Sequence, residues 1–500
     1  MKRSAKILAL ILAIITILPT LIACAETKDP EVTTEPTAST TAPEEGATNE
    51  DTSHLYDEEG YLKSDLPALD FGGETFTILY WSDVEMQEYE AEELNATLVN
   101  DAIYKRNANV QSKLNVTFEW LSTAGNNNKT SEFVNYVGNI YRGGDTPLDL
   151  ISAYSRTTAM CAIDGYCADM ADLPYLNFEM PWWPESLLDV VSIGDSIYFA
   201  SGDASINVLH LMYAMYCNNE LIKKYQLEDP IDLVRSNEWT LEKLITMTAD
   251  AYEDLDASNK KDEGDFYGFV GANYGLDAFY TGSDLRLVEQ DEDKLLVISE
   301  DFYSNKAVDL CTKLGAWIAS DDCYINGTHQ DSFVAQRAIF IQDRCHLADK
   351  QLAGKVDFSY SIIPTPLYDK DQENFISVVG NPFSLYGIFS NSEDVERAAA
   401  VLECWASEAY RTTTPAQFEM NMKLRYSETS DEADMYNIIR TTVCFDLGRL
   451  FNTELNDITD IFFRAAVNNQ NWSSLIGSNK IVLPKRMQVI ANAFTELQEN

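Results

Sequence analysis

Basic side chains are scarce in this chain of 500 residues. Lys and Arg together number 36 against 80 Asp and Glu, which gives a formal net charge of −44 at neutral pH. A surface this acidic repels phosphate backbones, so nucleic-acid binding is excluded as a main activity. It is also repelled by anionic lipid headgroups, so attachment to a membrane must be covalent or use an inserted segment.

Motifs that hold metals and cofactors or perform catalysis are also missing. The four histidines are far apart, and neither HExxH nor CxxC occurs, which removes the common zinc sites. No GxSxG, P-loop or GxGxxG pattern is present. The acidic stretches 291–293 and 369–373 lack the glycine and terminal glutamate of an EF-hand, so we expect solvated loops there. We therefore expect no metal, no cofactor and no catalytic residue.

A long hydrophobic run occurs only near the N-terminus. Positive charges at 2, 3 and 6 precede the apolar residues 7–18, which is typical of an export signal and too short for a membrane-spanning helix. Residues 21–24, Leu-Ile-Ala-Cys, resemble the lipobox of bacterial lipoproteins. We expect a signal peptide over 1–23, a lipid on Cys24, and a protein held on the outer face of the cell membrane. The alternative is an ordinary secretory signal with a chance cysteine.

The segment after Cys24 has little to bury. Residues 25–53 consist mostly of Thr, Glu, Pro and Ala, which cannot form a core. We therefore expect residues 24–65 to form the lipidated cysteine and a disordered tether that holds the folded part away from the bilayer.

Eight cysteines remain in addition to Cys24, an even number that an exported protein can pair. Cys161 and Cys167 bracket a short segment and are the most plausible disulfide. With 45% hydrophobic residues the chain has enough material for a core without such bonds.

From residue 66 onward the apolar residues follow helix and strand periods. Strand-like segments at 75–81, 116–120 and 148–152 alternate with helical patterns at 99–114 and 132–141. This order predicts a mainly parallel sheet flanked by helices, an α/β fold. Downstream we expect strands at 209–217 and 358–363, helices capped by Thr240 and Asn391, a short helix running into a strand over 331–341, and a mostly helical region from 413.

Aromatic residues gather at the expected strand ends and in loops: Trp81, Tyr154, Trp182, Trp183, Tyr274 and Tyr280. Ligands of open α/β sheets bind outside the carboxyl ends of the strands. Flat aromatic faces at such positions suit the apolar faces of sugar rings. The alternative for each of them is packing in the core or between lobes.

Six segments resemble, in chain order, motifs of the bacterial extracellular solute-binding proteins of ABC importers, the family that includes maltose-binding protein. They are 71–78 (FGGETFTI), 100–107 with 114–116 (NDAIYKRN, LNV), 216–221 (YCNNEL), 238–244 (EWTLEKL), 333–340 (FVAQRAIF) and 360–366 (YSIIPTP). The resemblance implies two hinged lobes, each a mainly parallel sheet flanked by helices. Lobe I would comprise 66–207 with 366–410, and lobe II 208–365 with 411–500. Ligand closes such lobes by shifting an open–closed equilibrium.

The resemblance also implies a binding site between the lobes. Its first-lobe contacts would be Trp81, Tyr154 and Trp182 or Trp183, and its second-lobe contacts Tyr274, Tyr280, Asp284 and Arg344, with Asp203 near the crossover as an acceptor for hydroxyls. We expect a monomer without enzymatic activity that hands a small solute, a mono- or oligosaccharide, to the membrane subunits of an ABC importer. The alternatives are a surface sensor or adhesion lipoprotein and a carbohydrate-active enzyme.

Overall fold

The computed structural model describes residues 55–144, 146–292 and 294–499. The expected signal peptide, the lipidation at Cys24 and the tether as far as residue 54 lie outside these residues. Within them, no helix combines the length and the hydropathy needed to span a membrane.

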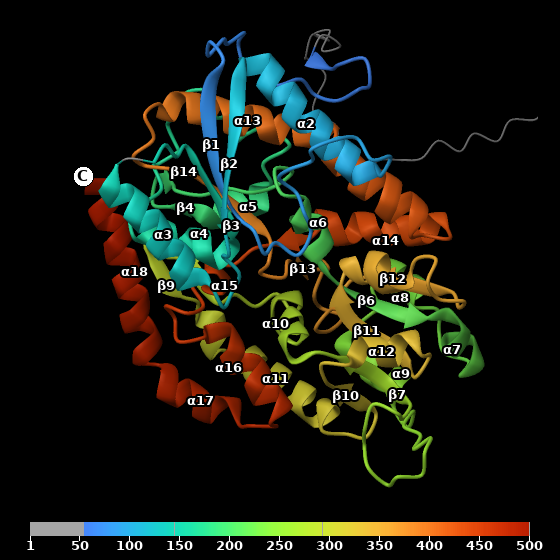
Figure 1. The fold of residues 1–500 in the computed structure, drawn as a ribbon. Helices are drawn as coiled ribbons and strands as arrows, with labels where there is room; N and C mark the ends of the chain where they lie inside the picture. The colour runs from blue at the N-terminus through green and yellow to red at the C-terminus, as the bar shows by residue number, and fades with distance from the viewer. Residues whose placement is uncertain (1–54, 145, 293, 500) are drawn as a thin grey trace, which may run out of the picture. The chain divides into compact units, whose positions relative to one another are not determined.

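The first sheet has the strand order β14-β3-β1-β2 (Figure 1). β1 (Glu74–Trp81) pairs in parallel with β2 (Val116–Thr123) and β3 (Leu150–Tyr154), and β14 (Ser384–Ile388) lies antiparallel to β3. The last six residues of β1 are all buried, as a strand covered on both faces requires. The flanking helices are α2 (Leu98–Leu114), α3 (Thr130–Gly143), α4 (Ser155–Ile163) and α13 (Val395–Arg411). We call this part lobe I.

The second sheet has the order β10-β7-β11-β6-β12 and forms lobe II. β10 (Cys323–Ile325), β7 (Tyr267–Gly271) and β11 (Ala338–Arg344) run parallel, whereas β6 (Tyr213–Asn218) is antiparallel to both β11 and β12 (Tyr360–Ile363). The helices around this sheet are α7 (Asn219–Lys224), α8 (Pro230–Arg235), α9 (Leu241–Thr248), α10 (Asp277–Gly282), α11 (Asn305–Ile318) and α12 (His329–Val334).

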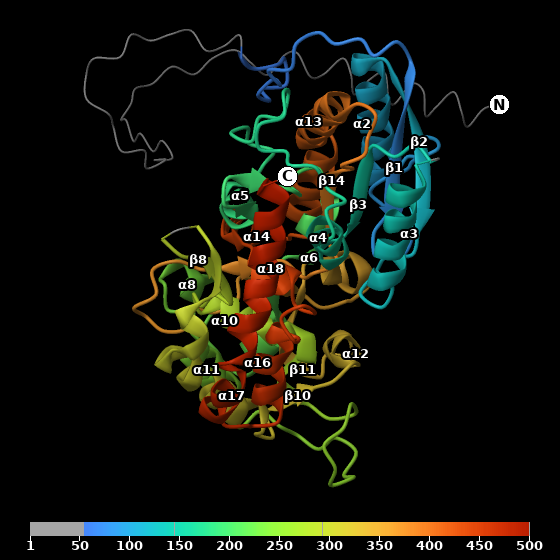
Figure 2. The same ribbon diagram turned by 90° about the vertical axis from the view of Figure 1, so that its left-hand side faces the viewer.

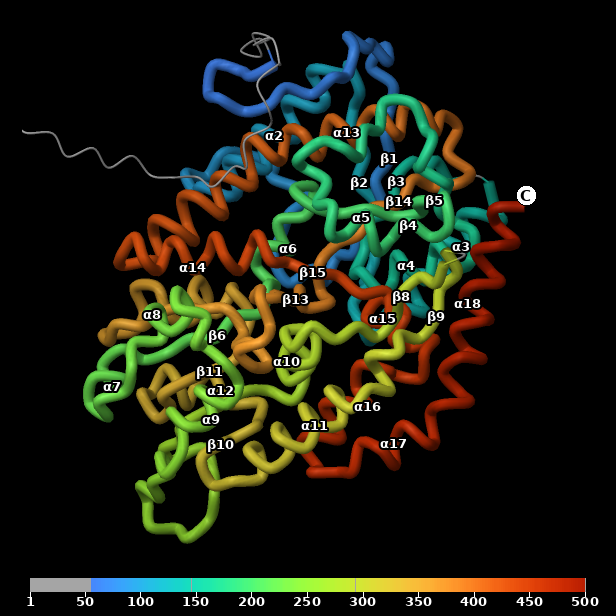
Figure 3. The backbone as a smooth tube through the Cα atoms, turned by 180° about the vertical axis from the view of Figure 1, so that it is seen from behind, coloured from blue at the N-terminus to red at the C-terminus, as the bar shows by residue number. Residues whose placement is uncertain are grey.

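Three segments that run between the lobes lie side by side. β13 (Ser377–Val378) pairs in parallel with β15 (Val443–Cys444), and Val379 forms a bridge with Met212, just after α6 (Ile206–Leu211). Figure 3 shows β13 and β15 between the two lobes. Chain segments that cross side by side between two lobes can form a hinge about which the lobes rotate.

The C-terminal region contacts both lobes. α14 (Ser430–Thr441) packs on β12 of lobe II, α15 (Leu447–Leu450) packs on α4 of lobe I, and α16 (Ile458–Val467) and α17 (Trp472–Asn479) pack on α11. The last helix, α18 (Val482–Glu499), lies against β9 (Leu296–Ile298) and reaches α4 (Figure 2). β9 pairs with β8 (Val288–Gln290), and a second short hairpin is formed by β4 (Ser192–Ile193) and β5 (Ser196–Ile197) after α5 (Glu185–Val191).

Several local predictions can be compared with these elements. Thr240 does cap α9, because its hydroxyl accepts a hydrogen bond from the Lys243 N–H. The segment 209–217, expected to be one strand, contains the end of α6 and most of β6; it is apolar throughout, so it shows no period that separates helix from strand. The helix expected to start at Asn391 starts at Val395 instead, with the Asp394 carboxylate accepting from Arg397 N–H.

The expected disulfide is absent from the described residues. Cys161 and Cys167 are free, buried thiols, as are the other six cysteines there. Burial raises the pKa of the Cys167 thiol to about 12, so the reactive thiolate is not formed at neutral pH.

Candidate functional site

Four of the expected site residues lie near the strand ends where the lobes meet. Trp81 and Tyr154 end β1 and β3, Arg344 ends β11, and Tyr274 follows β7. The carboxyl ends of parallel strands converge at one edge of a sheet, which brings residues so distant in sequence together. The indole of Trp81 packs edge-on against the Tyr154 ring, with centroids 5.7 Å apart. Trp81 is itself fully buried and acts as the support for Tyr154.

Glu85, which sequence reasoning missed, connects the two lobes. It lies in the loop after β1, and its carboxylate accepts a hydrogen bond from Arg344 Nη1 of lobe II at 3.3 Å. Its other oxygen lies 3.7 Å from His346 Nδ1 and 3.9 Å from Lys350 Nζ. We refer to the residues of this contact region as the interlobe cluster: Glu85, Tyr154, Tyr274 and Arg344.

Tyr274 is the exposed aromatic of the cluster. Its side chain is 44% exposed, whereas the other five predicted aromatic contacts are buried. The Arg344 guanidinium lies 5.5 Å from the centre of its ring, within the range of a cation–π contact. An exposed ring, a guanidinium and a carboxylate together offer both an apolar face and polar groups to a ligand.

The surroundings of Arg344, and of His346 beside the interlobe cluster, determine which of these side chains carries a charge. Burial, together with the charges of Arg344 and Lys350, lowers the pKa of His346 to about 3, so its imidazole is neutral at physiological pH. Burial opposes the charge of Arg344, but the Tyr213 hydroxyl and the carboxylates of Glu85 and Asp343 outweigh it and raise its pKa. Glu85 therefore faces a permanent cation.

A second polar group lies near the hinge. Arg449 forms an ion pair with Asp277 and donates from Nη2 to the Val379 carbonyl at 3.2 Å. Arg156, two residues after β3 ends, donates from Nε to the carbonyl of Arg449 at 3.0 Å. A position after a strand end is the signal that points to Arg156 and Glu85 in the sequence. Arg449 and Asp277 have no such signal, because only the folded chain brings them together.

Three of the predicted contacts are core residues, and this corrects the sequence-based assignment. The indole N–H groups of Trp182 and Trp183 both donate to Glu403 of α13 at 2.9 Å, and both side chains are buried. Tyr280 packs against Phe462 with ring centroids 4.9 Å apart. Flanking prolines or nearby glycines made these residues look like loop residues in the sequence. Large aromatic rings are, however, mostly buried in folded proteins.

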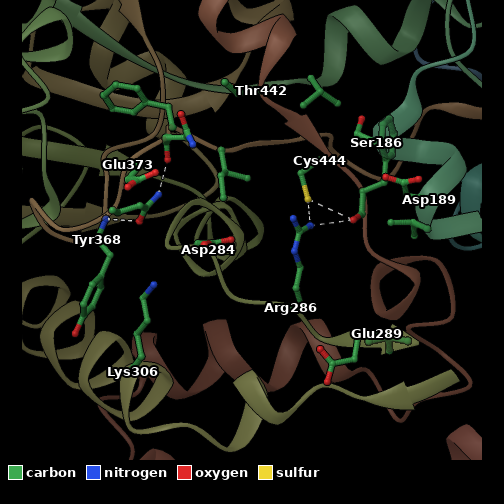
Figure 4. A pocket seen from close by; sticks show the side chains of 18 of the residues that line it. Ser186, Asp189, Asp284, Arg286, Glu289, Lys306, Tyr368, Glu373, Thr442 and Cys444 are labelled. Carbon is green, nitrogen blue, oxygen red and sulfur yellow. Dashed lines mark hydrogen bonds between the residues drawn. The ribbon is translucent and has the colours of Figure 1, made fainter. Parts of the chain in front are cut away.

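The two predicted carboxylates border other cavities. Asp284 lines a cavity of about 1220 Å³ whose other walls include Arg286, Lys306, Tyr368 and β15. In Figure 4 Arg286 points toward Cys444 in that wall. Asp203 lines an adjoining cavity of about 390 Å³ and accepts hydrogen bonds there from Thr414 and Arg440. Neither cavity is lined by the interlobe cluster, so these carboxylates are separate from it.

The chain is similar to known proteins in structure but not in sequence. No family model and no curated protein sequence matches the chain. A cyclo/maltodextrin-binding protein solved with maltotetraose matches with a TM-score of 0.55 at 11% identity, over 83% of this chain and 96% of that one. An ABC substrate-binding protein from Listeria monocytogenes in complex with cycloalternan matches with a TM-score of 0.52 at 12% identity, over 83% and 99%. The maltose-maltodextrin binding protein of Alicyclobacillus acidocaldarius gives 0.51 at 12%, over 83% and 100%.

The fold is that of the ABC substrate-binding proteins. The two-lobed α/β architecture implied by the six sequence motifs is thereby confirmed. At this level of identity the likeness extends to the fold, and the ligand has to be argued from the residues of the interlobe cluster.

Proposed function

We propose that this protein is a receptor that captures a mono- or oligosaccharide between its lobes and delivers it to an ABC importer. The observation that carries the proposal is the interlobe cluster, in which groups from both lobes meet at the strand ends of this fold. Structures with this fold include proteins solved with maltotetraose and with cycloalternan. Tyr274 would stack on a sugar ring, and Arg344, Glu85 and Tyr154 would bind hydroxyl groups.

Buried polar atoms near the cluster support a ligand rich in hydroxyls. In the described part of the chain, Arg344 Nε, Asp277 Oδ1 and Asn381 Oδ1 are among eighteen buried side-chain atoms that have no hydrogen-bond partner. Polar atoms left in this state are uncommon in folded proteins, because each costs roughly 1–3 kcal/mol. A ligand or water that enters as the lobes open would supply donors and acceptors to these atoms.

The proposal includes a location and a mode of action. The lipobox-like segment ending at Cys24 supports a lipid anchor on the outer face of the cell membrane, with the importer's membrane subunits as partner. The protein would act as a monomer and release its ligand unchanged, without enzymatic activity. Sugar incubated with the protein should therefore be recovered intact on chromatography, and new reducing ends would show an enzyme instead.

Thermal melting of the protein with a panel of sugars, amino acids and peptides tests the proposal. A ligand at about 100 times its dissociation constant stabilises the fold by roughly 2.7 kcal/mol, which is visible as a rise in Tm. A rise with one class of sugar supports the proposal and names that class. A rise with peptides or amino acids alone contradicts it. Loss of uptake of that sugar after deletion of the gene then separates import from sensing.

A further inference from the structure

The loop between α9 and β7 has an unassigned pattern of oxygen-bearing side chains. Residues 254–265 read Asp-Leu-Asp-Ala-Ser-Asn-Lys-Lys-Asp-Glu-Gly-Asp. An EF-hand loop of 12 residues binds Ca²⁺ through side chains at positions 1, 3, 5, 9 and 12 and through the carbonyl at position 7. Those positions here hold Asp254, Asp256, Ser258, Asp262, Asp265 and, for the carbonyl, Lys260. Neither of the acidic stretches considered from the sequence, 291–293 and 369–373, has this spacing.

The structure brings the first, third and last of these carboxylates together. One ligand oxygen from each of Asp254, Asp256 and Asp265 lies within 4.8 Å of the others. Ca²⁺ binds oxygen at about 2.3–2.6 Å, so two ligands of one ion lie at most about 5 Å apart. Asn259, at the sixth position where EF-hands carry glycine, has the left-handed backbone that this turn requires, with φ of 57°.

The charge of the loop is not neutralised by the protein. None of the five acidic residues between 254 and 265 forms an ion pair within the described part of the chain. The buried Asp265 carboxylate accepts hydrogen bonds only from groups without formal charge, among them the Tyr252 hydroxyl and the Leu255 and Asp262 N–H groups. Lys261, the basic residue in the middle of the loop, donates instead to the carbonyl of Ser320. Clustered carboxylates repel one another, and a divalent cation removes that repulsion.

We propose that residues 254–265 bind one Ca²⁺ ion through Asp254, Asp256, Ser258, Asp262, Asp265 and the Lys260 carbonyl. All of these ligands are oxygens, which suits Ca²⁺ better than a metal that prefers nitrogen or sulfur. Extracellular Ca²⁺ modules have dissociation constants of about 10⁻⁴–10⁻³ M, and we expect an affinity in that range. The site is independent of the proposed sugar site.

The ion would hold a projecting loop on lobe II. The base of the loop is closed by the bridge between Glu253 and Phe266, and Asp322 accepts from the Ala251 N–H at 2.9 Å. Figure 1 shows the loop extending beyond α9 and β7, away from lobe I. The ion would therefore raise the stability of lobe II without touching a sugar.

The test uses the full chain freed of metal with EDTA and titrated with Ca²⁺ in a calorimeter. Asp256→Asn is the informative variant, because Asp256 is exposed and its loss should not unfold the protein. Asp371→Asn, in the acidic stretch without the spacing, is the matched control. We expect one ion per chain for the parent and the control, and an affinity weaker by about tenfold or more for Asp256→Asn.

Terbium luminescence gives a second readout, since the hydroxyl of Tyr252 lies 3.1 Å from Asp265 Oδ2 and can sensitise a bound Tb³⁺. Ca²⁺ should displace Tb³⁺ from the parent and from Asp371→Asn. Equal Ca²⁺ affinities for the two variants, or no binding at 10 mM, overturns the proposal. Sugar binding measured in EDTA is expected to persist, so failure of this proposal and failure of the proposed function are distinguishable.

Discussion

Glu403 is a buried carboxyl that should make the stability of the protein depend on pH. Burial raises its pKa to about 7, although hydrogen bonds from Trp183, the Asn177 N–H and Trp182 act in the opposite direction. The folded state therefore holds this proton more tightly than the unfolded chain, whose glutamates have a pKa near 4.5. The resulting stabilisation is complete below about pH 4.5 and is lost as the pH rises through 7.

The corresponding variant is Glu403→Gln, which cannot ionise. We expect its free energy of unfolding to fall less between pH 5 and 8 than that of the parent, as measured by urea denaturation at several pH values. Glu396→Gln replaces an exposed glutamate on the same helix and should retain the parent's slope. An unchanged slope in Glu403→Gln would show that Glu403 is ionised throughout.

Tyr274 is the residue whose replacement should most directly weaken sugar binding. Tyr274→Ala removes the exposed ring beside Arg344 and should reduce affinity by about 1 kcal/mol or more, or at least fivefold. Tyr136→Ala, at a similarly exposed tyrosine (38%) on α3, is the control and should bind as the parent does. Equal affinities of the two variants in a calorimetric titration would remove Tyr274 from the site.

Only part of the candidate site could be predicted from the sequence, because the sequence shows a residue's position along a strand but not its partners in the folded chain. Trp81, Tyr154, Tyr274 and Arg344 lie at or just after strand ends, as the sequence indicated, because a strand end fixes where the neighbouring side chain lies; their contact with a ligand stays a prediction. Trp182, Trp183 and Tyr280 were assigned wrongly, because residue type and loop context do not reveal a buried partner such as Glu403. Glu85 was missed among 80 carboxylates although it follows the end of β1, because the sequence does not show that it pairs with Arg344.

At the level of elements, the end of α18 should stabilise the packing of the C-terminal region on lobe I. Phe494 is 1% exposed and packs against Tyr198 of lobe I and Phe451, with ring centroids 5.3 and 5.8 Å apart. Phe494→Ala should lower the free energy of unfolding by roughly 3–5 kcal/mol, because it leaves a cavity. Val489→Ala changes a residue of the same helix that is 69% exposed, and it should shift Tm little. Similar melting of the two variants would mean that the end of α18 is not docked.

The elements that were predicted well share a clear period or a clear cap. The helical spacing over 99–114 and the Thr240 cap gave α2 and α9, and the alternation at 116–120 gave β2. The errors occur where the sequence is uniformly apolar, as around α6 and β6, or where two residues compete as caps, as with Asn391 and Asp394. The local sequence does not decide between helix and strand around α6 and β6, or between Asn391 and Asp394 as the cap. Tertiary packing decides both.

For the folded unit as a whole, the order of strands and helices in the sequence predicted only part of each sheet. The strand–helix alternation before residue 152 predicted the parallel part of lobe I. It could not show that β14, more than 200 residues later, pairs with β3, or that β6 and β12 run antiparallel to their neighbours. These pairings depend on the chain crossing between lobes, which leaves no local pattern in the sequence.

The ion pair between Glu85 and Arg344 should favour the conformation in which the two lobes are in contact. It joins the two lobes, and Arg344 is largely buried, so screening by solvent is incomplete. Removing the charge with Glu85→Gln would favour separated lobes in the equilibrium that ligand shifts. We expect a larger radius of gyration without ligand by small-angle X-ray scattering, and a sugar affinity a few-fold weaker because less of the population is closed.

The control is Glu132→Gln, which removes an exposed ion pair with Lys129 inside lobe I and should change neither quantity. The contribution of Glu85 should also diminish in 0.5 M NaCl, because salt screens a partly exposed carboxylate. If Glu85→Gln weakens sugar binding but leaves the radius of gyration of the free protein unchanged, Glu85 acts as a ligand contact alone. A larger radius together with weaker binding means that lobe closure and capture depend on the same charge, since the pair forms only where both lobes supply a residue to the site.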